Sequence, residues 1–125
     1  MTVHAARRPP GVLLLAAFFA AVAASDLWQV AQFMVDRNAE LPVLVAVHGV
    51  LGLVGAATAA AVWRRSSSAP WLAAAWGVLT AALLVALPSV LGLPPEARSG
   101  LWVSAAAVLV VAGLAAWYLR RRTAA

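Results

Sequence analysis

The chain has 125 residues, of which 65% are hydrophobic, nine are basic and four are acidic. A soluble domain of this size does not need so much apolar sequence for its core, so the composition indicates a membrane protein. The net charge of +5 comes entirely from arginines that flank apolar segments. We therefore expect anionic lipid headgroups, and not nucleic acid, as their partner. There is no cysteine, which excludes disulfides and thiolate metal sites.

Two apolar segments occupy the first half of the chain. The first predicted span covers residues 11–35 and follows Arg7-Arg8-Pro9-Pro10, where the prolines suit a helix entry. Residues 36–40 form a short polar turn. The second predicted span covers residues 41–63 and is followed by Arg64-Arg65. Each segment is long enough to cross a bilayer, which takes about 20 residues.

The second half of the chain repeats this outline. The third predicted span covers residues 70–93, begins at Pro70-Trp71 and is expected to kink at Pro88 in its last turn or two. The fourth covers residues 99–119 and stops at a run of three arginines. The spans leave only short loops and tails, so the whole chain is expected to be a single four-helix transmembrane domain.

The arginines predict the orientation of these spans. Seven would lie on one side of the membrane and two, Arg37 and Arg98, on the other. Because positively charged loops stay in the cytoplasm, the predicted fold is an all-α, up-down-up-down four-helix bundle with both termini inside. We expect it in a bacterial cytoplasmic (inner) membrane. The cytoplasmic set is Arg7, Arg8, Arg64, Arg65, Arg120, Arg121 and Arg122.

Asp26 is the most informative residue, because a carboxylate inside a span costs roughly 2.5–3.5 kcal/mol and must face protein or water. On an ideal helix it shares one face with Gln29 and Phe33, with Gln32 at the margin. Continuing inward, this face becomes apolar. Any wet cavity beside Asp26 should therefore close near the middle of the membrane.

His48 lies at a matching depth on the second span, if the turn between the two spans is centred near Asn38. If His48 and Asp26 touch, they could share one proton. Three roles are open for the pair: attachment of one helix to the other, a substrate or proton site, and haem ligation by His48. The candidate residues for ligand binding or proton coupling are Asp26, Trp28, Gln29, Gln32 and His48.

The second span also carries a run of small residues on the face of His48. Small residues at helical spacing let two backbones approach closely, so we expect them to form the contact with the first span. They are Gly52, Gly55, Ala56 and Ala59.

Two further features bear on polarity inside the bundle. Trp28 and Trp76 lie deeper than the other tryptophans, so each needs a partner for its indole N–H or a pocket. Thr58 and Thr80 are the only polar candidates in the inner half, and their hydroxyls can bond to the preceding helical turn.

No catalytic, metal or nucleotide motif accompanies these features, so we expect no cofactor and favour a protein that is not an enzyme. The favoured function is a small membrane binding or accessory protein. It would engage a partner protein, a lipid or a small apolar molecule through helix faces or an outward-facing pocket near Asp26 and His48. The alternative is a small transporter or channel, formed by oligomerisation, with Asp26 and His48 as its coupling or gating pair. A homo-oligomer or a larger membrane complex fits either function.

Overall fold

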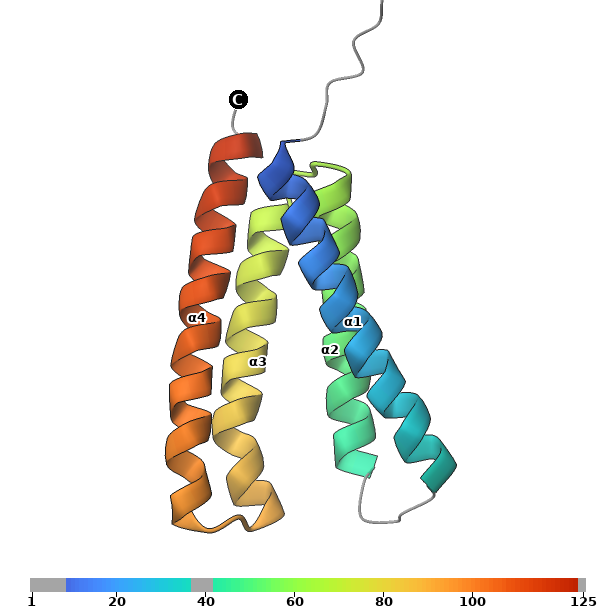
Figure 1. The fold of residues 1–125 in the computed structure, drawn as a ribbon, viewed down its shortest axis with the longest axis vertical. Helices are drawn as coiled ribbons and strands as arrows, with labels where there is room; N and C mark the ends of the chain where they lie inside the picture. The colour runs from blue at the N-terminus through green and yellow to red at the C-terminus, as the bar shows by residue number, and fades with distance from the viewer. Residues whose placement is uncertain (1–8, 37–41, 124–125) are drawn as a thin grey trace, which may run out of the picture.

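The computed structural model describes residues 9–36 and 42–123 (Figure 1). They form four helices, α1 (Pro10–Asp36), α2 (Pro42–Trp63), α3 (Ala69–Leu91) and α4 (Pro95–Thr123). Each is long and apolar enough to cross a membrane, which confirms the all-helical, four-span prediction and indicates an integral membrane protein. The predicted turn after Asp36, and the roles of Arg7, Arg8 and Arg37, lie outside the described residues.

Proline and glycine determine where the helices begin and end. Proline is the first residue of α1, α2 and α4 and the second of α3, positions at which its missing N–H breaks no helical hydrogen bond. α3 continues through Pro88 and ends at Leu91, because Gly92 takes a left-handed backbone with a φ of 67°. The helix α4 begins at Pro95, four residues before the predicted fourth span.

The helices pack as two pairs. α1 contacts α2 along its length, α3 contacts α4, and the pairs meet mainly through α2 and α3. The start of α1, the connection from α2 to α3 and the end of α4 lie together at one end of the molecule (Figure 1). We call this the arginine end, because it carries Arg64, Arg65, Arg120, Arg121 and Arg122. From there the two pairs diverge toward the opposite end, where α3 connects to α4 (Figure 1).

The buried core is concentrated where the two pairs converge. Phe19 of α1 and Trp76 of α3 meet edge to face with ring centroids 5.3 Å apart, and Phe18 approaches the same indole at 5.9 Å. Such contacts are favoured by the quadrupoles of the rings. The buried cluster consists of Val12, Ala16, Phe19, Ala61, Val62, Ala69, Ala73, Trp76, Ala112 and Leu119. This cluster takes residues from all four helices and holds them together at the arginine end.

Small residues set the spacing within each pair. Gly77 of α3 lies against Ala112 of α4 so closely that an added methyl group would overlap it. A methyl group at Gly55 of α2 would come within 3.3 Å of Cβ of Ala23 on α1. Because lipid tails are as apolar as the side chains, this close van der Waals contact, and not the hydrophobic effect, holds membrane helices together.

Candidate functional site

Asp26 and His48 meet across the α1–α2 interface. Nδ1 of His48 lies 2.8 Å from Oδ1 of Asp26, which confirms the matched depth predicted from the sequence. An ionised carboxylate offers only acceptors, so in that state the ring N–H of His48 donates the hydrogen bond. The contact gives a polar group within a span the partner that it needs.

The pair is largely enclosed by its own two helices. The side chain of Asp26 is 14% exposed and that of His48 is 27% exposed. Phe33, two turns after Asp26 on α1, packs on the imidazole with the two ring centroids 5.8 Å apart and the planes tilted by 33°. One edge of the imidazole thus faces a carboxylate while one face is covered by an aromatic ring. This arrangement fixes the orientation of the ring relative to α1.

Two glycines allow α1 and α2 to come this close. Both Gly52 and Gly55 are buried, and a methyl group at Gly52 would come within 2.9 Å of Leu27 on α1. Ala59 is half-buried against the core. Ala56, which the sequence placed on the same face, is exposed. The close contact therefore runs through the two glycines next to His48.

The other predicted site residues do not join the pair. Trp28 and Gln32 line a separate shallow groove of about 440 Å³ on the surface of α1, together with Ala31 and Val35. Trp28 is 64% exposed and belongs to a different face of α1 from Asp26. Gln29 is half-buried. The structure thus divides the candidate set into a closed interhelical pair and an open groove beside it.

Apolar packing separates the pair from the arginine end. Phe19 lies about two turns before Asp26 on α1, is 1% exposed and packs on Trp76. Val12 and Leu119 fill the interior beyond it. The face of α1 that carries Asp26 is therefore apolar from Phe19 toward the arginine end, as the sequence predicted.

Two polar atoms in the core nevertheless have no partner. Thr58 donates its hydroxyl to the Val54 carbonyl at 2.7 Å, as predicted for a threonine on a membrane helix. By contrast, Nε1 of Trp76 and Oγ1 of Thr80 are buried and unpaired in the described structure. They are four residues apart on α3 and so share one face of it. Buried polar groups without a partner are rare and call for an explanation such as a bound water or ligand.

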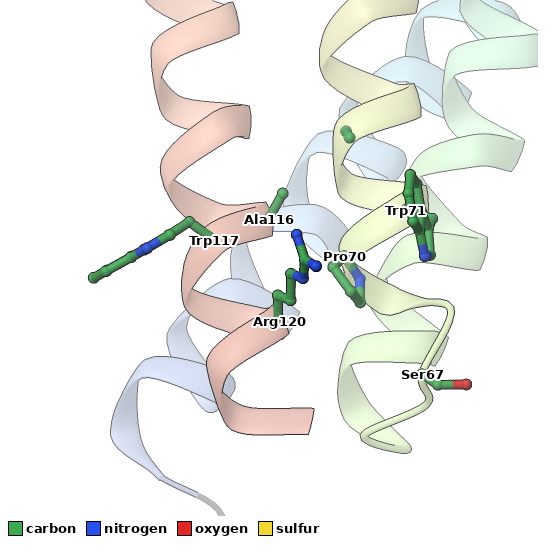
Figure 2. A pocket seen from close by; sticks show the side chains of 7 residues that line it. Ser67, Pro70, Trp71, Ala116, Trp117 and Arg120 are labelled. Atoms are coloured by element: carbon green, nitrogen blue, oxygen red, sulfur yellow. The ribbon is translucent and has the colours of Figure 1, made fainter. Parts of the chain in front are cut away.

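A further groove was missed by the sequence analysis. It lies between the start of α3 and the end of α4, has a volume of about 470 Å³, and is lined by Ser67, Pro70, Trp71, Ala74, Ala116, Trp117 and Arg120 (Figure 2). The sequence contains one signal for this groove. Trp117 and Arg120 are three residues apart at the end of the fourth span, and they lie opposite Pro70-Trp71, which begins the third span.

Among the described residues, no group of three or more His, Asp or Glu side chains is placed to hold a metal ion. Comparison of the chain with protein-family models, with curated proteins and with solved structures gives no match.

Proposed function

We propose that the protein is a small binding or accessory protein of a bacterial cytoplasmic membrane. In this proposal the four helices run up-down-up-down with both termini in the cytoplasm, as the arginine distribution favours. The pair of Asp26 and His48 then lies in the outer half of the membrane. The site would engage a partner protein, a lipid or a small apolar molecule, and we favour a partner transmembrane helix.

The observation that carries the proposal is the separation of the closed pair from the open groove. Asp26 and His48 satisfy each other, whereas Gln32 and Trp28 are exposed on α1 beside them. An amide on the membrane-facing side of a helix has two donors and one acceptor to satisfy, and such groups form hydrogen bonds between membrane helices. A partner helix laid in this groove would supply both an acceptor for Gln32 and apolar contact for the indole of Trp28. The pair of Asp26 and His48 would hold α1 in place on α2.

Site-specific photo-crosslinking in cells tests this function. A photo-reactive amino acid in place of Ala31, within the groove, should give a discrete adduct with one membrane protein. The same group in place of Leu53, which is 69% exposed on α2, serves as the control. The Ala31 adduct should be lost with Gln32→Leu and kept with Leu53→Ala. Equal adducts from both positions, or an adduct indifferent to Gln32→Leu, would show that this groove has no specific partner.

The second candidate function, transport by an oligomer, is favoured by the unpaired atoms of Trp76 and Thr80. Transport needs polar groups beyond Asp26 in the inner half of the membrane, and Nε1 of Trp76 and Oγ1 of Thr80 are buried there without partners. In proteoliposomes, a proton or cation flux that disappears in both Asp26→Asn and Thr80→Val would support this candidate. A flux that is absent, or unchanged by both substitutions, would leave the binding function as the better account.

A further inference from the structure

The groove at the arginine end is bordered by two tryptophans, and an arginine lines its outer part. Trp71 extends from the first turn of α3 on one side, and Trp117 extends from α4 on the other (Figure 2). The guanidinium of Arg120 lies between them, next to Ala116 and Pro70 (Figure 2). A cavity of about 470 Å³ is within the size range of ligand sites in proteins.

The packing of α3 on α4 explains why a hollow remains between the two tryptophans. The helices approach closely where Gly77 meets Ala112, about one turn deeper in the bundle. At the groove itself both helices present alanine, at Ala74 and Ala116, so no large side chain fills the space. The part of the groove that lies deeper in the bundle is therefore apolar, and the part at the arginine end is basic.

The charge at this end is of one sign. Five arginines of the described residues lie here, whereas the carboxylates of Asp26 and Glu96 belong to the opposite half of the molecule. Arg121 stacks on Trp117, with its guanidinium carbon 4.3 Å from the centroid of the ring, which places a second cation beside the wall of the groove. An anionic ligand is electrostatically complementary to this end.

We propose that the groove binds one anionic glycerophospholipid. Arg120 receives the phosphate, and an acyl chain descends over Ala74 and Ala116 between the indoles of Trp71 and Trp117. Arg120 already interacts within the chain, but a guanidinium has five N–H donors and can also hold a phosphate oxygen. Tryptophan and arginine both prefer the level of the lipid headgroups, so the depth of the groove suits this ligand.

Lipid retention by the purified full-length chain, measured by native mass spectrometry with phosphatidylglycerol and phosphatidylcholine, tests the proposal. Phosphatidylglycerol should be retained in preference to phosphatidylcholine, and Arg120→Gln should weaken its retention by about tenfold, the effect of losing one charge-assisted hydrogen bond. Arg122→Gln is the matched control, because it removes the same charge from the same cluster outside the groove. Equal losses in both variants would show that the arginines attract lipid only diffusely and would overturn the site.

The shape of the groove is tested separately from its charge. Ala116→Leu fills the space between the tryptophans and should weaken phosphatidylglycerol retention, while Ala106→Leu, at an exposed position of α4, should not. Helical circular dichroism of both variants checks that the fold survives. Retention of phosphatidylglycerol by well-folded Ala116→Leu at the level of the unmodified chain would overturn the proposal, as would equal retention of phosphatidylcholine. A dimer that dissociates in Ala116→Leu would instead assign the groove to a second copy of the chain.

Discussion

Replacing Asp26 with asparagine and His48 with alanine, singly and together, measures how much the two side chains stabilise each other. His48→Ala should be the more costly single change, because it leaves a carboxylate without a partner at a site only 14% exposed. A central carboxylate costs roughly 2.5–3.5 kcal/mol, and this one lies nearer the end of α1, so we expect a loss of about 2 kcal/mol. Asp26→Asn keeps an acceptor for the imidazole and should cost about 1 kcal/mol.

The double variant should then cost about 2 kcal/mol and not the sum of about 3, which gives a coupling free energy of about 1 kcal/mol. The separation of 2.8 Å between Nδ1 and Oδ1 supports a coupling of this size. The free energy of unfolding would be measured by reversible unfolding in mixed micelles of a mild detergent and dodecyl sulfate, followed by helical circular dichroism. Each variant must retain the helical signal before denaturant is added.

A second cycle provides the control. Trp28→Leu and His48→Ala should be additive within about 0.5 kcal/mol, because Trp28 lies on a different face of α1 and lines a separate groove. The same additivity in the cycle of Asp26 and His48 would refute the reasoning. The 2.8 Å contact would then contribute nothing to the stability of the fold, and the helix-attachment role of the pair would be lost.

Three further predictions address packing, buried polarity and topology. Gly52→Leu should destabilise the fold by about 2 kcal/mol or more, because its side chain would collide with α1. Val50→Leu, at a half-exposed position, should change the free energy of unfolding by less than about 0.5 kcal/mol. Equal stabilities of the two variants would refute the contact at Gly52. Thr80→Val should be neutral or stabilising by about 1 kcal/mol, since the buried hydroxyl has no partner. A clear decrease in the free energy of unfolding would show that the hydroxyl does have a hydrogen-bond partner. Thiol reagents confined to the outer face should label Ser99→Cys and not Ser67→Cys, and the reverse pattern would invert the proposed orientation.

The sequence by itself determined which segments become helices and which polar residues of the first two helices lie level with each other. Both properties depend on distance along the chain: apolar length predicts a span, proline marks its start, and a short turn fixes which residues of consecutive spans are level. Asp26 and His48 were paired in this way, and the structure confirms their contact. The helix α4 begins at Pro95, before the predicted fourth span, because a helix can extend beyond the apolar segment that crosses the membrane.

Only the tertiary structure decided how each helix is rotated about its own axis. In a soluble helix an apolar stripe marks the inner face, but these four helices are apolar on nearly every side, so the sequence gives little information about rotation. Trp28 could therefore be grouped with Asp26 although it faces a separate groove, and Ala56 could be assigned to a contact from which it is turned away. That Trp71, Trp117 and Arg120 line one groove likewise depends on how two helices are rotated and packed, because close contact at Gly77 positions the residues one turn away.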